Sequence, residues 1–315
     1  MRKKTISTFY DERMVLMDEN VPNISKSPLK PKKIIEYIHK NGLLEYFDIK
    51  EFEPFEKEVF YTAHFEKYVD NFFNGIEPQA SSNGLKWNAQ FADSVRYTNA
   101  SLYNAILNSI KNPDEVSFSN TAGFHHATPD EGMGFCTFSG QVIASLKIYR
   151  ELGLSGAYLD LDGHFGNSLE DSRYFAPDLN EAVPTECNIN PQYHSKYYII
   201  DLQERLEKLR ERIIQGKTHY LVFCHGADSH FWDDYGTQLN TEQWIECSKI
   251  VYNFVKSIEE ELKKPFPLAL SLFGGYRKDD YNSVLSLHLA DLVECLNILC
   301  DNDIKYKPSV IEPRY

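Results

Sequence analysis

The sequence lacks the cysteine spacing of a disulfide framework. It contains no CxxC pair, and its cysteines are Cys136, Cys187, Cys224, Cys247, Cys295 and Cys300. Cys136 and Cys224 lie in apolar surroundings, and apolar surroundings are typical of buried structural thiols. We therefore expect free thiols in a reducing compartment.

Positive charge and long apolar runs are also scarce. The 33 Lys and Arg residues stand against 46 Asp and Glu, which gives a net charge of -13. This balance argues against nucleic acid or an anionic membrane as the main partner, although it would attract a cationic substrate. PFPLALSLF is among the longest apolar runs and is too short to span a membrane. The basic N-terminus becomes acidic where a signal peptide needs its apolar segment, so we expect a soluble, cytoplasmic protein.

The chain has no internal repeat, low-complexity linker or clear break in composition, so a single domain over residues 1–315 is the simplest organisation. Short β-rich runs occur at 116–119, 157–162, 220–224 and 268–273. Segments with helical periodicity occur at 140–152, 202–213, 241–262 and 282–299. The alternation predicts an α/β fold, in which helices cover both faces of a mainly parallel sheet in three layers.

Unusual polar residues follow each predicted strand. In YLDLDGHFGN (158–167), Asp160, Asp162 and His164 alternate, so in a continuous strand all three would share one face. The residues after the other strands are His125 and His126, Asp228, and Tyr276. Since ligands bind parallel α/β sheets at the carboxyl ends of the strands, these side chains are predicted to surround one pocket.

Two carboxylates and an imidazole are a plausible ligand set for Zn²⁺ or another divalent first-row metal. Asp162 and His164 would supply two ligands, and Asp228, in a Gly-Ala-Asp turn, is placed to supply the third. An open coordination position would activate water, and neutral histidines nearby would move its proton. The alternative is a structural hydrogen-bonded cluster at 160–164 with a His pair that serves only its loop.

Taken in order, these motifs resemble the histone deacetylase family, and in particular its bacterial deacetylase-like amidohydrolases. The similar segments are YDERMVLMD, AHFEKYVD (63–70), GFHHATPDEGMGFCTFSGQVIASL (123–146), YLDLDGHFGN, CHGADSHFWDD (224–234) and LFGGY (272–276). The resemblance spans nearly the whole chain and implies an arginase/deacetylase-like fold. It also implies a zinc-dependent deacetylase that acts on N-acetyl-lysine, in a peptide or protein, or on a small acetylated amine.

The resemblance assigns the metal ligands. Asp162, His164 and Asp228 would hold zinc, with ferrous iron as the alternative. Asp160 would help to hold a structural potassium ion beneath the site. The related ureohydrolases use two metals and need D-x-H-x-D, but Gly166 stands at the third position here, so a site for one metal is expected.

The resemblance also assigns the catalytic residues. His125 and His126 would flank the attacking water, and Asp160 would hydrogen-bond His125. Asn167 would orient His126 without adding charge, so His126 is predicted to be the less basic of the pair. Tyr276 would donate a hydrogen bond to the amide oxygen and stabilise the oxyanion with the metal.

Gly134 and Phe135 resemble the wall of the family's narrow acyl-lysine tunnel, although a Gly-Phe pair alone is typical of simple packing. The loop that normally carries the second tunnel aromatic lacks its usual Pro-Gly pattern here. Tyr193 is a candidate for that aromatic.

Three more positions follow from the resemblance. Asn88 falls where many members carry an aspartate that grips the substrate backbone, and a plain surface loop is the alternative. Tyr235 stands where the polyamine-specific branch presents a glutamate, which argues against a polyamine substrate. Lys33 falls near the family's arginine at the base of the site, but a solvated lysine at a helix start is preferred.

Two other functions remain as hypotheses. One is an acetylpolyamine amidohydrolase, and the other is a catalytically silent binding module that keeps the fold. The presence of every catalytic residue type named above favours an enzyme over the silent module.

Overall fold

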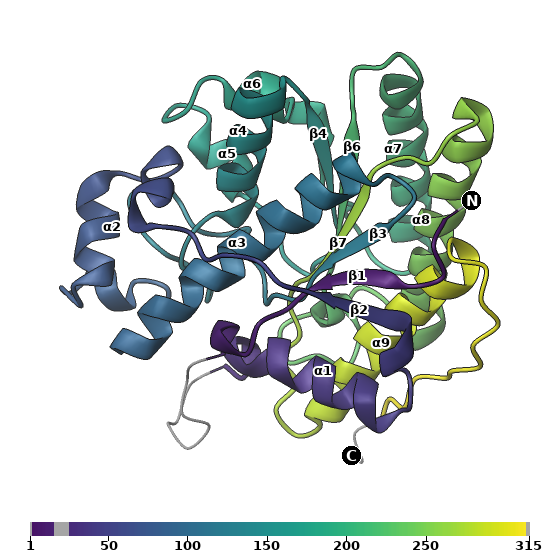
Figure 1. The fold of residues 1–315 in the computed structure, drawn as a ribbon. Helices are drawn as coiled ribbons and strands as arrows, with labels where there is room; N and C mark the ends of the chain where they lie inside the picture. The colour runs from purple at the N-terminus through teal and green to yellow at the C-terminus, as the bar shows by residue number, and fades with distance from the viewer. Residues whose placement is uncertain (1, 16–24, 313–315) are drawn as a thin grey trace.

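The computed structural model describes residues 2–15 and 25–312, so the last three residues of YDERMVLMD lie outside the described residues. Its centre is a seven-stranded sheet in the order β2-β1-β3-β7-β6-β4-β5, and each neighbouring pair is parallel (Figure 1). The strands are β1 (Ile6–Phe9), β2 (Phe47–Lys50), β3 (Val116–Ser119), β4 (Gly156–Asp160), β5 (Asn188–Ile189), β6 (Tyr220–His225) and β7 (Leu268–Leu272). The predicted parallel α/β fold is confirmed.

Helices form a layer on each side of the sheet (Figure 1). One layer is built round the packed pair α3 (Ala89–Lys111) and α4 (Gly140–Leu152), with α2 (Glu66–Phe73), α5 (Ser168–Ser172) and α6 (Leu179–Ala182) beside them. The other is a row of neighbours: α7 (Lys196–Ile214), α8 (Thr241–Leu262), α9 (Tyr281–Ile298) and α1 (Lys30–Lys40). No helix among the described residues is long and apolar enough to cross a membrane.

The predicted boundaries agree closely for β3, α4 and α8, but the strand predicted at 157–162 is too long. β4 ends at Asp160, whose Oδ1 accepts the N–H of Asp162 at 3.1 Å. Asp162 Oδ1 in turn accepts the N–H of His164 at 2.9 Å. These local side-chain hydrogen bonds turn the backbone out of the ladder, so the three polar residues do not share one strand face.

α3 is the longest described helix at 23 residues, and it is not among the predicted helices. The helix lacks a simple apolar stripe because it is covered on several sides, by β1, β3 and β7 and by α4 and α2. Small and polar residues such as Ser94, Asn99 and Ser101 are therefore buried along with its apolar ones. The edge strands β2 and β5 and the short strand β1 next to β2 are also absent from the predictions.

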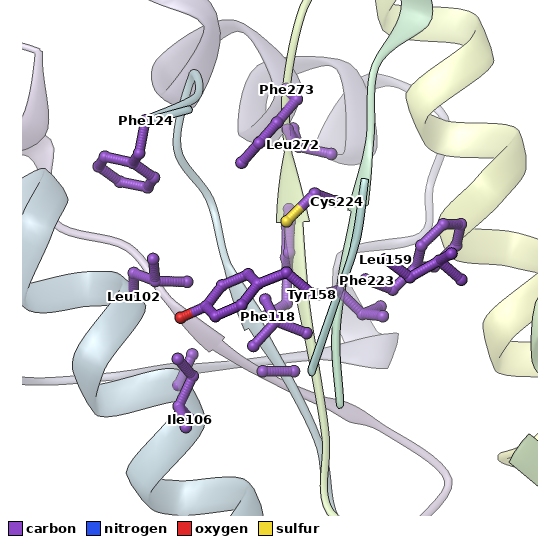
Figure 2. Close-up of a cluster of buried hydrophobic side chains, with 14 of the residues drawn as sticks. Leu102, Ile106, Phe118, Phe124, Tyr158, Leu159, Phe223, Cys224, Leu272 and Phe273 are labelled. Atoms are coloured by element: carbon purple, nitrogen blue, oxygen red, sulfur yellow. The ribbon is translucent and has the colours of Figure 1, made fainter. Parts of the chain in front are cut away.

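The apolar core extends from the middle of the sheet to the carboxyl ends of its strands. Figure 2 shows Leu102 and Ile106 of α3 near Phe118 and Tyr158 of the sheet, all of them buried. Higher in the same view, the buried rings of Phe124 and Phe273 lie beside the loops that follow β3 and β7; Phe124 immediately precedes His125. Burial of each such side chain contributes about 1.5–3 kcal/mol, so the polar loops rest on a well-packed base.

His64 fastens the α2 segment to the start of α4. The N–H of Ser139, the N-cap of α4, donates to His64 Nε2 at 2.9 Å. Nδ1 therefore carries the proton and donates to the carbonyl of Thr128 at 2.8 Å. Burial is the main cause that lowers the pKa of His64 to about 4, so the ring is neutral at pH 7.

The His64 linkage predicts a pH-dependent stability difference. At pH 8, His64→Phe should lower the free energy of unfolding by about 2–5 kcal/mol, because two buried polar groups lose their partners. As pH falls from about 6.5 to about 4, the unfolded chain binds a proton that the folded wild type resists. Wild-type stability therefore falls in this window, and the difference from the variant narrows.

Urea unfolding at pH 8 and pH 5 measures both stabilities. The control is His39→Gln, because His39 is exposed on α1 and its loss should change stability by less than about 0.5 kcal/mol. If wild type and His64→Phe differ in free energy of unfolding by the same amount at both pH values, His64 is not the buried neutral imidazole described above.

Candidate active site

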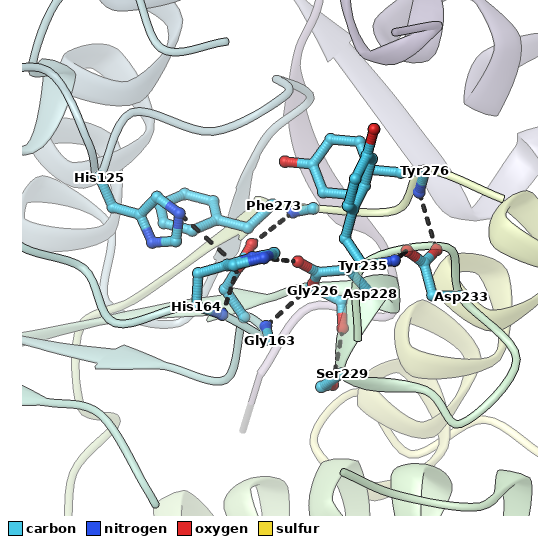
Figure 3. A network of polar contacts seen from close by, with 12 residues as sticks. His125, Gly163, His164, Gly226, Asp228, Ser229, Asp233, Tyr235, Phe273 and Tyr276 are labelled. Atoms are coloured by element: carbon cyan, nitrogen blue, oxygen red, sulfur yellow. Dashed lines mark hydrogen bonds and ion pairs between the residues drawn. The ribbon is translucent and has the colours of Figure 1, made fainter. Parts of the chain in front are cut away.

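The predicted site residues meet at the carboxyl ends of four strands that are neighbours in the sheet, β3, β7, β6 and β4. The residues that follow these strands, in the same order, are His125 and His126, Tyr276, Asp228, and the group Asp162 and His164. Figure 3 shows His125, His164, Asp228 and Tyr276 gathered in one region. Segments far apart in the chain thus meet at the strand ends, as the pattern predicts. Thr121 Oγ1 and Ser271 Oγ, for example, lie 3.0 Å apart, although 150 positions separate the two residues.

Asp162, His164 and Asp228 form a group whose ligand atoms all lie within 4.8 Å of one another. His164 Nδ1 lies 3.1 Å from Asp162 Oδ1 and 2.9 Å from Asp228 Oδ2. The two carboxylates are buried, whereas the imidazole is half-buried. A buried pair of carboxylates with one imidazole has the donor types and spacing of a site for a divalent first-row metal.

Backbone groups hold the two carboxylates in place. The N–H of Gly274 donates to Asp162 Oδ2 at 2.7 Å, and the N–H of Gly163 donates to Asp228 Oδ1 at 3.0 Å. A Cβ on Gly226 or Gly274 would lie 2.3 Å from the Asp228 carboxylate. The glycines therefore let the backbone approach the ligand oxygens closely, as in the supporting shell of a metal site.

The pKa values of these ligand residues indicate that a cation would stabilise the group. Burial, followed by the charge of Asp162, raises the pKa of Asp228 to about 8. Hydrogen bonds to Asp162 and Asp228 raise the pKa of His164 to about 10. The negative charge of the buried carboxylates contributes to both shifts. A divalent ion would compensate that charge, so the residues present fit a metal.

The described residues form one such group. Gly166 stands where a second metal would need a carboxylate, and a Cβ there would lie 2.6 Å from Asp160 Oδ2. Its N–H already donates to Asn190 Oδ1 at 2.7 Å. Among the residues that the structure describes, Asp162, His164 and Asp228 are the cluster with metal-ligand spacing.

His125 and His126 lie side by side, with ring centroids 4.1 Å apart, but they have different partners. His125 Nδ1 lies 2.8 Å from the carboxylate Oδ2 of Asp160, and His126 Nδ1 lies 2.8 Å from the amide Oδ1 of Asn167. Asn167 Nδ2 donates to Asp171 Oδ2 at 2.7 Å, which fixes the amide orientation. His126 Nδ1 is therefore the donor, and its Nε2 is left to accept a proton.

The pKa values of the two imidazoles separate in the predicted order. Burial opposes protonation of His125, but the charges of Asp162 and Asp160 outweigh it and raise the pKa to about 9. Burial and the neighbouring His125 lower the pKa of His126 to about 4. One ring of the pair is thus charged and the other neutral near pH 7.

Tyr276 lies in the turn after β7, and three aromatic rings surround its phenol. Its ring centroid is 5.3 Å from that of Tyr235, 5.6 Å from that of Phe135 and 6.3 Å from that of His164. Burial is the main cause that raises the pKa of Tyr276 well above its usual range. The hydroxyl therefore keeps its proton and can act as a hydrogen-bond donor.

The other predicted contact residues divide into two groups. Gly134 lies against the His pair, since a Cβ there would be 2.5 Å from His126 Cδ2, and Phe135 and Tyr235 flank Tyr276. Asn88 instead caps α3, where its Oδ1 accepts the N–H of Phe91 at 2.7 Å. Tyr193 is 65% exposed, and Tyr235 rather than Tyr193 forms the ring contact with Tyr276.

Lys33 is the lysine that the family resemblance puts near the base of the site, but Lys30 occupies that place. Lys33 pairs with Glu36 at 3.5 Å on the surface, as the preferred alternative expects. Lys30 is fully buried, and its Nζ donates to the carbonyls of Phe273 and Gly274. Burial lowers the pKa of Lys30 to about 8. Helical spacing could have indicated that Lys30 is buried, because it lies on the same face of α1 as the buried Ile34 and Ile38.

Comparisons with known proteins show which sequences and folds this chain is similar to. A family model described as histone deacetylase domain matches residues 25–180. Histone deacetylase 8 of Danio rerio is 25% identical over 163 residues, which cover 49% of this chain and 43% of that protein. Histone deacetylase 8 of Xenopus tropicalis is 24% identical over 161 residues, covering 48% and 43%. The chain thus spans less than half the length of the curated relatives it matches.

The crystal structure of the HDA15 HD domain superposes with a TM-score of 0.68 at 16% identity, covering 97% of this chain and 91% of that one. Fold and strand-end site together define an α/β protein of the arginase-like class. Within that class, the chain belongs to the histone deacetylase family. Asp228 and Tyr276 lie beyond the matched residues 25–180, so their placement in the site rests on the geometry above.

Substitution of one of the three ligand residues should reduce the affinity of the site for a metal. The wild type should bind one divalent ion per chain, and Asp228→Ala should weaken Zn²⁺ affinity by at least about 100-fold, because loss of a ligand exceeds the effect of losing a supporting contact. Elemental analysis after dialysis and calorimetric titration with Zn²⁺ measure the two quantities.

Asp234→Asn is the matched control, because Asp234 is an exposed carboxylate in the same loop. It should bind Zn²⁺ like the wild type. Unchanged affinity in Asp228→Ala would show that the cluster is structural and not a metal site.

Proposed function

We propose that this chain is a metal-dependent amidohydrolase that removes the acyl group from N-acetyl-lysine or a related N-acetylated amine. The proposal rests on the side chains that surround the three metal ligands. A neutral imidazole with a free Nε2, a charged imidazole and a protonated phenol surround three metal ligands. Amide hydrolysis needs these groups: a base for water, an acid for the leaving amine and donors for the oxyanion.

Asp162, His164 and Asp228 would hold the metal, and we propose zinc, with ferrous iron as a second ion that the same ligands suit. When bound, the metal would supply Lewis acidity toward the attacking water and the acetyl carbonyl. A potassium ion near Asp160 remains a prediction from the family resemblance. The six buried free thiols are consistent with the proposed cytoplasmic location.

His126 would act as the general base and then as the general acid. Its Nδ1–H is held by Asn167, so Nε2 can take a proton from water and later give it to the leaving amine. Without that proton the amine would have to leave as an unstable anion. His125, paired with Asp160, would keep its charge and stabilise the developing negative charge electrostatically.

The aromatic wall would select and orient the acyl-amine. Phe135 and Tyr235 flank Tyr276, so an extended methylene chain would run between rings before its amide reaches the Tyr276 hydroxyl. Tyr235 offers no carboxylate to a second ammonium group of a substrate. This supports N-acetyl-lysine over an acetylated polyamine, which remains the second substrate class to test.

Tyr276→Phe tests the proposed oxyanion donor. Because the ring packing is kept and one hydrogen bond to the transition state is lost, kcat should fall by about 10²–10³-fold. In His126→Ala, kcat should fall by at least the same factor, because this substitution removes the group that carries the proton. The assay is a panel of acetyl-lysine peptides, longer acyl-lysine peptides and acetylated polyamines with metal-loaded protein.

Tyr197→Phe, an exposed tyrosine on α7, is the control and should keep wild-type turnover. Turnover that is unchanged in both Tyr276→Phe and His126→Ala would refute the mechanism. The substrate class that the wild type hydrolyses with the highest kcat/KM decides between acyl-lysine and polyamine.

A further inference from the structure

One carboxylate joins the turn that carries Tyr276 to the loop that carries Asp228. Asp233 Oδ2 accepts the N–H of Tyr276 at 2.7 Å and the N–H of Arg277 at 3.2 Å. Its other oxygen, Oδ1, accepts the N–H of Tyr235 at 3.1 Å. Figure 3 shows Asp233 beside the backbone of Tyr276, with Tyr235 on the same side of the site. Three backbone groups thus converge on one half-buried side chain.

The loop that presents Asp233 is closed on itself. Gly236 returns so close to Asp228 that a Cβ there would lie 1.3 Å from the Asp228 carbonyl oxygen. Ser229 Oγ donates to the Gly226 carbonyl at 3.0 Å, and Gln238 Nε2 reaches the Gly163 carbonyl at 2.7 Å. The position of Asp233 is therefore tied to the backbone round the metal ligands.

In the turn that carries Tyr276, Gly274 is held by Asp162, Ala227 and Lys30. The turn lies between β7 and α9, outside both elements, and Gly275 before Tyr276 has φ +141, a conformation that other residues rarely adopt. The N–H groups of Tyr276 and Arg277 find their acceptor in Asp233. Hydrogen bonds to a carboxylate are stronger than those between neutral groups, so they suit a position that must be held closely.

Asp233 is poorly placed to bind a substrate cation itself. Both of its oxygens face backbone donors, Oδ1 that of Tyr235 and Oδ2 those of Tyr276 and Arg277. The adjacent Asp234 makes a single long bond of this kind, 3.3 Å to the N–H of Lys278. Asp233 therefore acts on the site through the two tyrosines that it holds.

We propose that Asp233 is a positioning residue that fixes Tyr276 and Tyr235 relative to the metal ligands, an inference that rests on the function proposed above. Placement matters in such sites because an oxyanion donor is effective only within hydrogen-bond distance of the reacting oxygen. Loss of the Asp233 carboxylate leaves the N–H groups of Tyr276 and Arg277 without this acceptor and so loosens the placement of the Tyr276 phenol.

The first test observes the tyrosines directly and does not depend on activity. The full chain is labelled with 3-fluorotyrosine, and the ¹⁹F resonances of Tyr276 and Tyr235 are assigned from their Phe variants. Asp233→Ala should shift or broaden both resonances. Asp233→Asn keeps one acceptor oxygen and the side-chain shape, so it should move them less. Asp234→Asn, the matched neighbour, should leave them in place.

The second test is a double-mutant cycle in kcat. Asp233→Ala should lower kcat by about tenfold or more while KM changes less than about threefold, because a transition-state contact is lost. In the Tyr276→Phe background the same substitution should lower kcat by less than about threefold, since its target is already removed. Asp233→Asn should recover part of the activity.

Two results would overturn the proposal. One is a Tyr276 resonance that is unchanged in Asp233→Ala, or in the isosteric Asp233→Asn if the alanine variant does not fold. The other is an equal loss of kcat with and without the Tyr276 hydroxyl. Wild-type protein that hydrolyses no substrate of the panel would refute the proposed function, whereas the fluorine spectra would still decide the role of Asp233.

Discussion

Two carboxylates, Asp162 and Asp228, are buried side by side after the ends of β4 and β6. The surrounding structure has to compensate their negative charge. Burial and mutual repulsion make such a pair costly unless hydrogen bonds and cations compensate. Backbone N–H groups of Gly163 and Gly274 reach their oxygens, and His164 lies between them. The glycines and tight turns hold the two carboxylates in place, and the apolar core beneath supports these turns.

The same charge differentiates the two neighbouring histidines. They share a loop and stand in ring contact, yet Asp160 supports one and the neutral Asn167 supports the other. The charges of Asp162 and Asp160 raise the pKa of His125, whereas burial and the neighbouring His125 lower that of His126. The difference in basicity between the two imidazoles therefore follows from their surroundings and not from the rings themselves.

Sheet order brings these parts together. β7 lies between β3 and β6, so the turn with Tyr276 is placed between the His pair and the Asp228 loop. Strand ends define where each loop starts, but the loops need their own links to hold side chains at hydrogen-bond distances. Asp233 is such a link, since it joins backbone from two loops that follow different strands.

Local chemistry made much of this protein predictable from sequence. Apolar periodicity located α4 and α8, and the spacing of Asp and His residues after β-rich runs located the site. Tertiary structure decided the rest. It turned the chain out of β4 at Asp160, buried Lys30 in place of Lys33, and set Tyr235 rather than Tyr193 against Tyr276. These outcomes depend on contacts and hydrogen bonds specific to the folded chain, and residue spacing does not record which distant segments will meet.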